Sequence, residues 1–144
     1  MNTTALKVVI DTNVMVAAIG RQSPFRWIFD CLVEGRLSLC VSTEILPEYR
    51  EILERKTSAS IAENVVNFIT ISPFTQKTDV FYRFNLVSQD PDDNKYADCA
   101  VSSGAACIIS NDRHFRQLKE IDFPKIQILT LAEFEKEYKA HLTG

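Results

Sequence analysis

The stretch that decides the fold is Lys7-Val8-Val9-Ile10-Asp11-Thr12-Asn13. Its β-branched run predicts a short, fully buried strand, and the polar residues after Ile10 predict a turn into a helix. A lone carboxylate directly after a buried strand is costly unless a ligand or hydrogen-bond donors satisfy it. Asp11 is therefore the first candidate site residue. The alternative interpretation is a helix N-cap, satisfied by amide groups of the next turn.

Carboxylates recur where predicted strands end or predicted helices begin. Strand ends in an open α/β sheet converge on one crevice, so these acids are expected to meet there. Two carboxylates about 4 Å apart repel by about 4 kcal/mol at an effective dielectric near 20. A cluster must therefore take up protons or bind a cation, and a hard divalent metal ion is the simplest solution. The acids that join Asp11 in this set are Glu44, Asp93, Asp98 and Asp112.

Strands and helices alternate along the chain. Apolar runs predict strands at residues 6–10, 37–41, 107–109 and 126–129, and alternation at 80–87 permits one more. Helices are predicted at about 14–20, 24–35, 59–69 and 90–103. Two more are predicted: a long helix that has Glu44 in its first turn, and a final helix that begins after Thr130. Gly35 and Gly104 are expected to end two of these helices, and Ser42 or Thr43 to cap the one with Glu44. This order predicts a three-layer α/β/α domain whose central sheet is mainly parallel and has four to five strands.

The bulk composition fits one folded domain over residues 1–144. The chain is 46% hydrophobic and 24% charged, and no apolar stretch is long enough to span a bilayer. The first residues lack a basic region followed by an apolar core, so a cytoplasmic location is expected. Four cysteines without a C-x-x-C pair are expected to be buried free thiols. A net charge of −3 argues against a protein that coats nucleic acid through bulk charge.

Each acid also has an ordinary structural interpretation. Glu44 lies where the helix dipole alone favours an acid. Asp93 belongs to the run Asp90-Pro91-Asp92-Asp93, and capping a helix needs only one of these acids. Asp98 follows Asp93 by five residues, about 140° round an ideal helix, so the two share a site only if Asp93 sits at the cap. The alternative for Asp98 is a solvated surface acid, and Asp112 could cap the segment that follows it.

Other catalytic arrangements are not supported by the sequence. No glycine-rich phosphate-binding motif occurs, and no Ser or Cys nucleophile has a well-placed partner. The two histidines, His114 and His141, do not form a metal-binding set. His114 follows Asp112 by two residues, so it is a candidate for contact with a phosphate bound at that acid. The chemistry is therefore assigned to the acids.

The chain resembles the PIN domain family over most of its length. The similar segments are Val8-Val9-Ile10-Asp11-Thr12-Asn13-Val14, Ser42-Thr43-Glu44-Ile45-Leu46, the run from Asp90 to Ala100, and Ile108-Ile109-Ser110-Asn111-Asp112. Four segments in this order are more specific than any one of them. The resemblance extends to the PIN-family toxins of bacterial toxin–antitoxin systems, which carry the same Asp-Pro-Asp-Asp run. One departure is Asn111, which stands where the family frequently has glycine.

The resemblance implies a metal-dependent endoribonuclease that cleaves single-stranded RNA, with Mg²⁺ or Mn²⁺ as the cofactor. It implies that Asp11, Glu44, Asp93 and Asp112 are the catalytic acids, that Asp98 is an extra metal ligand, and that the protein is a homodimer with a protein antitoxin. From the chemistry of hard cations, Asp11 and Asp112 are expected to hold the metal ion, with Asp93 bound to it directly or through water. Glu44 is expected to orient the attacking water. Residues expected to fix the carboxylates are Thr12, Asn13 and Ser110, and those expected to bind phosphate are Arg21, Lys95, Arg113 and Arg116.

Three other functions compete with this one. A structure-selective DNA nuclease would use a related acid cluster, although the chain has no evident insertion to clamp DNA. A phosphoryl-transfer domain with Asp11 as the nucleophile would need a second Asp two residues later, where this chain has Asn13. The third alternative is not an enzyme but a non-catalytic module that binds protein. The presence of all the acids argues against it.

Overall fold

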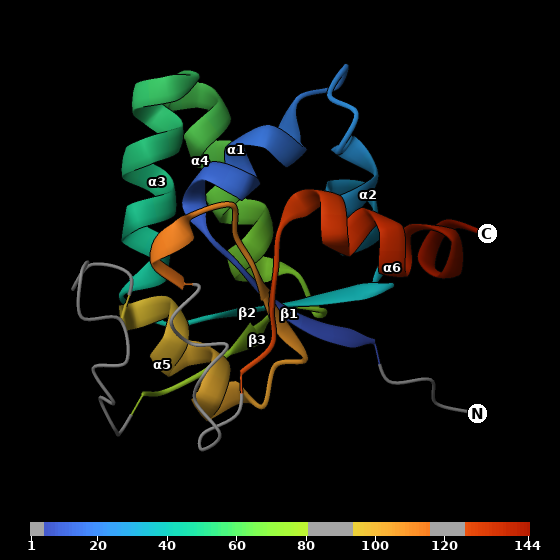
Figure 1. Ribbon diagram of the computed structural model, residues 1–144. Helices are drawn as coiled ribbons and strands as arrows, with labels where there is room; N and C mark the ends of the chain where they lie inside the picture. The colour runs from blue at the N-terminus through green and yellow to red at the C-terminus, as the bar shows by residue number, and fades with distance from the viewer. Residues whose placement is uncertain (1–4, 81–93, 116–125) are drawn as a thin grey trace.

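The computed structural model describes residues 5–80, 94–115 and 126–144 (Figure 1). In this part of the chain, five strands form one sheet in the order β3-β2-β1-β4-β5. Every pairing in it is parallel. The prediction of a mainly parallel sheet of four to five strands is therefore confirmed. The strands are β1 (Leu6–Ile10), β2 (Leu37–Val41), β3 (Gln76–Lys77), β4 (Cys107–Ile109) and β5 (Ile128–Leu129).

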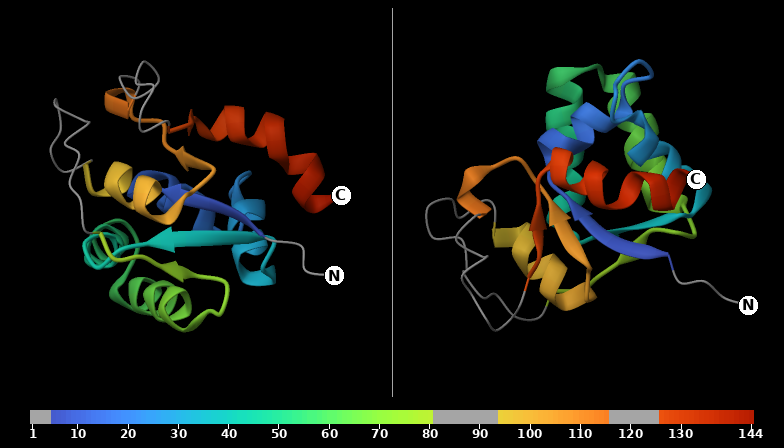
Figure 2. Two further views of the ribbon diagram at one scale, coloured as in Figure 1. Left: turned by 90° about the horizontal axis from the view of Figure 1, so that it is seen from below. Right: turned by 45° about the vertical axis from the view of Figure 1, so that its right-hand side comes forward.

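Helices cover both faces of this sheet. From β1 the chain moves outward to β2 and then to β3, and afterwards it crosses back over β1 to reach β4. Because parallel crossovers are right-handed, the helices of the outward and the returning connections must lie on opposite faces. Figures 1 and 2 show α5 on one face and the other helices on the opposite face, as the three-layer prediction requires. The helices are α1 (Thr12–Ile19), α2 (Arg26–Glu34), α3 (Ile45–Lys56), α4 (Ala59–Ile71), α5 (Asn94–Ser103) and α6 (Leu131–Thr143).

The core lies between the sheet and these helices. Val8, Val9 and Ile10 of β1 are fully buried, as expected of a central strand covered on both faces. The helix α6 packs on α2, where the rings of Trp27 and Phe134 stack with their centroids 5.7 Å apart. All four cysteines are buried free thiols, which confirms that prediction.

Several helix ends match the signals in the sequence. Thr130 accepts a hydrogen bond from Glu133 N at 3.1 Å, and Glu133 Oε1 accepts one from Thr130 N at 2.9 Å, which completes a capping box at the start of α6. Gly35 ends α2 in the left-handed conformation, with φ 79°. Gly104, with φ 68°, follows α5 in the same way.

Two local predictions differ from the structure. The cap expected from Ser42 or Thr43 is wrong, because Glu44 occupies the N-cap position of α3 and makes no side-chain cap hydrogen bond within the described chain. The two-residue strand β3 was not predicted, and within the described residues its one partner is β2. Residues 81–87 of the alternating segment lie outside the described residues. Among the helices of the described chain, none is long and apolar enough to cross a membrane.

Candidate active site

The candidate site lies where the chain changes direction in the sheet. β1 and β4 are neighbours, but the connection after β1 leads to one edge of the sheet, whereas β4 leads to the other. Crevices at such switch points, outside the carboxyl ends of the strands, are where open α/β sheets bind ligands. Asp11 follows β1 directly and Ser110 follows β4 directly. The topology therefore brings these two side chains together across 99 residues of sequence.

Asp11 is held from two sides. One oxygen, Oδ1, accepts a hydrogen bond from Val14 N at 2.9 Å, so Asp11 is the N-cap of α1. The other oxygen, Oδ2, accepts from the Ser110 hydroxyl. The residue as a whole is only 7% exposed. The cap interpretation of the sequence is thus correct, and it uses only one of the two oxygens.

Asp112 is linked to Asp11 through Ser110. Its backbone N–H donates to Ser110 Oγ at 3.0 Å, and that same hydroxyl donates to Asp11. The Asp112 carboxylate accepts from the backbone N–H of His114 at 2.9 Å, and the His114 ring nitrogen Nδ1 lies 3.4 Å from the same oxygen. The two acids are therefore joined by one serine, and Asp112 stays more accessible than Asp11, with a side chain that is 32% exposed.

Glu48, in α3, is the third acid at this site. Its Oε2 accepts from Thr12 Oγ1 at 2.7 Å and from the Tyr96 hydroxyl, and its Oε1 lies 2.8 Å from Lys95 Nζ. The next residue, Tyr49, is fully buried, and its hydroxyl donates to the carbonyl of Ile10 at the end of β1. This last contact fixes α3 against β1 immediately before Asp11.

The electrostatics of Asp11 depend on its burial and on the two neighbouring acids. Burial raises the pKa of Asp11 above its ordinary value, and the negative charges of Asp112 and Glu48 raise it further. The hydrogen bonds from Ser110 and Val14 N oppose that rise, because they stabilise the charged form. An ionised Asp11 is therefore partly compensated by donors, and a nearby cation would compensate it further.

The donor chemistry fits a hard divalent ion. Asp11 and Asp112 offer carboxylate oxygens, which Mg²⁺ and Mn²⁺ prefer. Within the described residues, each Asp11 oxygen accepts one hydrogen bond, which leaves it a further acceptor position. Within residues 5–80, 94–115 and 126–144, no group of three His, Cys, Asp or Glu side chains could hold a metal ion. The third acid expected from the sequence, Asp93, lies outside this part of the chain, as does Arg116.

The remaining predicted residues are placed in different surroundings. Asp98 is 2% exposed, so it is not a solvated surface acid. Glu44 is exposed at the N-cap of α3, one turn before Glu48. Asn13 is also exposed, and its side-chain oxygen accepts a hydrogen bond from Lys56 Nζ at 2.8 Å. Arg113 is exposed beside Asp112, whereas Arg21 lines a different surface, between α1, α2 and α4.

Two residues of the site were not singled out from the sequence. Glu48 and Tyr96 stand in the segments that resemble the PIN domain or directly after them, but nothing local distinguishes them from other acids and aromatic residues. A usable signal was the spacing of Glu44 and Glu48, since residues four apart lie on one helix face. Asn111, the departure from the family pattern, accepts from Leu131 N at 3.0 Å and ties the loop after β4 to the start of α6.

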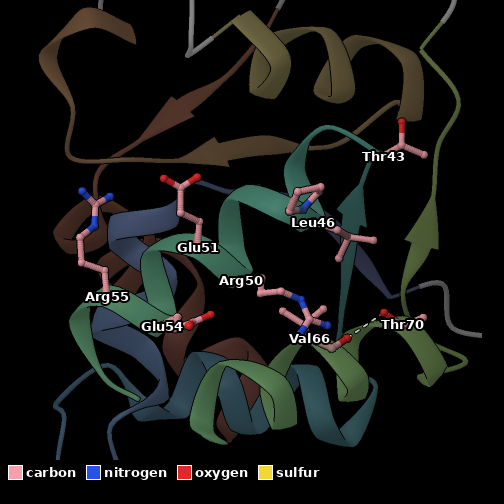
Figure 3. Close-up of a pocket in the computed structure, with 9 residues that line it drawn as sticks. Thr43, Leu46, Arg50, Glu51, Glu54, Arg55, Val66 and Thr70 are labelled. Carbon is pink, nitrogen blue, oxygen red and sulfur yellow. Dashed lines mark hydrogen bonds between the residues drawn. The ribbon is translucent and has the colours of Figure 1, made fainter. Parts of the chain in front are cut away.

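A second concave surface lies between α3 and α4 (Figure 3). Its volume is about 940 Å³, and the residues of α3 that line it include Arg50, Glu51, Glu54 and Arg55. Asp11, Glu48 and Asp112 do not line it. We therefore assign the chemistry to the carboxyl ends of β1 and β4 and not to this groove, because the buried acid Asp11 lies there together with the part-buried acids Asp112 and Glu48.

Comparison with known proteins supports this fold. A crystal structure of VapBC2 from Rickettsia felis bound to a DNA fragment from its promoter has a TM-score of 0.59 and 14% identity, covering 87% of this chain and 98% of that one. DNA-bound VapBC from Salmonella typhimurium has a TM-score of 0.56 and 20% identity, with the same coverage of 87% and 98%. No curated protein matches the chain. The family model for the PIN domain matches residues 7–114, well over half of the sequence, so the chain belongs to the PIN domain family.

Proposed function

We propose that this protein is a metal-dependent endoribonuclease that cleaves single-stranded RNA. The observation that carries the proposal is the buried carboxylate of Asp11, whose charged form is opposed by burial, by Asp112 and by Glu48. A protein retains such a cluster at a cost to its stability, and carboxylates grouped at a strand-end crevice are suited to binding a cation. Membership in the PIN domain family supports the same assignment.

The metal ion would be Mg²⁺ or Mn²⁺, held by Asp11 and Asp112 together with Asp93. When bound, such an ion lowers the pKa of a water molecule and stabilises the charge on the leaving oxygen. Asp98 stays a candidate for an additional ligand. Its burial in α5 means that it would act from within the fold and not from the surface.

The other residues orient these acids. Ser110 donates to Asp11 Oδ2 and fixes the rotamer of this carboxylate, and Thr12 donates to Glu48 Oε2. We assign to Glu48 the role that was predicted for Glu44, which is to orient the attacking water. Glu48 is joined to Thr12, the residue next to Asp11, whereas Glu44 is exposed one turn away.

The substrate would be bound by cations at the edge of the site. Arg113 is the best placed in the described chain, because it is exposed and directly follows Asp112. Arg21 and Arg116 remain candidates for contacts farther along the RNA. A net charge of −3 means that RNA binding relies on such local contacts and not on the charge of the whole protein.

We further propose that the protein is the toxin of a bacterial toxin–antitoxin system. Similarity to VapBC structures bound to DNA supports a partner protein, which here would be the cognate antitoxin. The homodimer expected from the family belongs to the same proposal. Four buried free cysteines suit a reducing compartment, so we propose that the protein acts in the cytoplasm.

The test is cleavage of RNA and DNA oligonucleotides of one sequence by wild type and by Asp11→Asn, with Mn²⁺ and with EDTA. The proposal predicts that wild type cuts RNA with Mn²⁺ only, and that Asp11→Asn is slower by about a hundredfold or more. Cleavage that survives both EDTA and Asp11→Asn would rule out the metal nuclease. Preferential cutting of DNA would favour a structure-selective DNA nuclease, and no cutting at all would favour a protein-binding module.

A further inference from the structure

The contacts of Glu48 point to a role for Lys95 that differs from phosphate binding. We infer that Lys95 and Tyr96 are positioning residues, which hold the Glu48 carboxylate in the orientation used for RNA cleavage. This inference rests on the proposed function, because it concerns the same site. It revises the expectation that Lys95 binds phosphate.

Donors on α5 and at the start of α1 engage both oxygens of Glu48. Oε2 accepts from Thr12 Oγ1 at 2.7 Å and from the Tyr96 hydroxyl, and Oε1 accepts from Lys95 Nζ at 2.8 Å. A carboxylate has about four acceptor positions, and the contacts among the described residues use three of them, which leaves one on Oε1 beside the lysine. Within this part of the chain, Glu48 therefore keeps one acceptor position with which to contact a water molecule.

Lys95 also contacts the aromatic ring of Tyr96. Its ammonium lies 5.7 Å from the centre of the Tyr96 ring, and its side chain is 15% exposed. The Glu48 side chain is 26% exposed, so this ion pair is shielded from water more than an ordinary surface pair. Tyr96 is 2% exposed, and its hydroxyl contacts both Thr12 and Glu48. The pair is thus built into the fold, whereas a phosphate-binding lysine needs a side chain that reaches into solvent.

The arrangement joins three helices through one carboxylate. Glu48 comes from α3, Thr12 from α1, and Lys95 and Tyr96 from α5, which covers the opposite face of the sheet from α3. One residue, Asn94, separates these two α5 residues from the Asp90-Pro91-Asp92-Asp93 run of the sequence. The orientation of Glu48 therefore depends on the segment that also supplies Asp93.

The inference makes a distinct kinetic prediction. A positioning residue affects the chemical step, so Lys95→Met should lower kcat by about 10- to 100-fold and leave KM for RNA within about twofold. Lys95→Arg, which keeps the charge and a donor, should recover most of that loss. A phosphate-binding lysine would instead raise KM, and its loss would weaken the dependence of KM on salt.

The experiment is a double-mutant cycle in steady-state RNA cleavage with Mn²⁺, using Lys95→Met, Glu48→Gln and the double variant. Tyr96→Phe serves as a second probe of the same carboxylate. Lys139→Met is the matched control, because Lys139 pairs with Glu135 on α6 and its removal costs the protein the same charge. Circular dichroism checks that every variant is folded.

We expect the double variant to be no slower than Glu48→Gln alone, because Lys95 acts only through Glu48. Additive losses, an unchanged kcat in Lys95→Met, or a rise in KM alone would overturn the inference while leaving the nuclease intact. Absence of cleavage by wild type would instead overturn the proposed function, and with it the inference.

Discussion

The hydroxyl of Ser110 offers the sharpest test of how the site is held together. Ser110→Ala removes the hydroxyl that donates to Asp11 Oδ2. The same hydroxyl oxygen accepts from the backbone N–H of Asp112, with 3.0 Å between Ser110 Oγ and Asp112 N. Asp11 is 7% exposed, so water has little access to replace the lost donor. The substitution therefore leaves a buried charged group with one hydrogen bond, from Val14 N.

The size of the effect depends on the charge of Asp11. A hydrogen bond to a charged group contributes about 1.5–3 kcal/mol and one between neutral groups about 0.5–1.5 kcal/mol. We therefore expect Ser110→Ala to lower the free energy of unfolding by about 1.5–3 kcal/mol where Asp11 is ionised, and by about half as much where it is protonated. The pKa of Asp11 should rise further in the variant, because the Ser110 hydrogen bond opposes the effect of burial.

Urea denaturation in EDTA across a range of pH measures both effects, and carbon NMR of the carboxyl group follows the pKa of Asp11. Ser102→Ala is the matched control, because Ser102 is exposed on α5. A loss below about 0.5 kcal/mol at every pH, with the pKa of Asp11 unchanged, would refute the proposed link from Ser110 to Asp11.

Three further substitutions test the electrostatics and the fold. Asp11→Asn in EDTA should stabilise the protein at neutral pH. Folding raises the pKa of Asp11, so the protonated Asp11 contributes fully to stability below the unfolded pKa of 3.8. That contribution is lost as pH rises through the folded pKa, whereas Asn carries no charge at any pH. The gain should be about 1.4 kcal/mol for each unit of the shift and should vanish as pH falls toward the unfolded value, and a gain that did not depend on pH would contradict this cause. Thr130→Ala removes the cap of α6 and should cost about 1 kcal/mol in urea denaturation, whereas an unchanged midpoint would mean that the capping box is not formed in solution. Gly35→Ala should cost about 1–2 kcal/mol, because Gly35 has φ 79° and an added Cβ would lie 2.7 Å from the Phe74 ring; an unchanged melting temperature would exclude this backbone conformation.

The parts of the fold that follow from local patterns were predictable from the sequence. β2 and β4 have the predicted bounds, and Thr130 caps α6 as expected, because apolar runs and capping residues act over a few neighbours. β3 was not predictable in this way. Its residues, Gln76 and Lys77, have no apolar pattern, and they form a strand only because the edge of β2 offers hydrogen-bonding groups.

The choice between Glu44 and Glu48 shows where sequence reasoning stops. Both acids lie near the start of α3, four residues apart, and each satisfies the same expectation of an acid in the first turns of a helix. Glu48 differs from Glu44 because it accepts hydrogen bonds from Thr12 and Tyr96, which are 36 and 48 residues away from it in the sequence. Contacts of this range depend on the packing of three helices, and no local pattern encodes them.

The most direct measurement of the central claim is RNA cleavage with Mn²⁺ by Glu48→Gln and Glu44→Gln in parallel. Both variants remove one negative charge from α3, so the comparison isolates position. We predict that Glu48→Gln is slower than wild type by about a hundredfold or more, and that Glu44→Gln stays within about threefold of it. A large loss in Glu44→Gln together with near-normal cleavage by Glu48→Gln would contradict the site described for this protein.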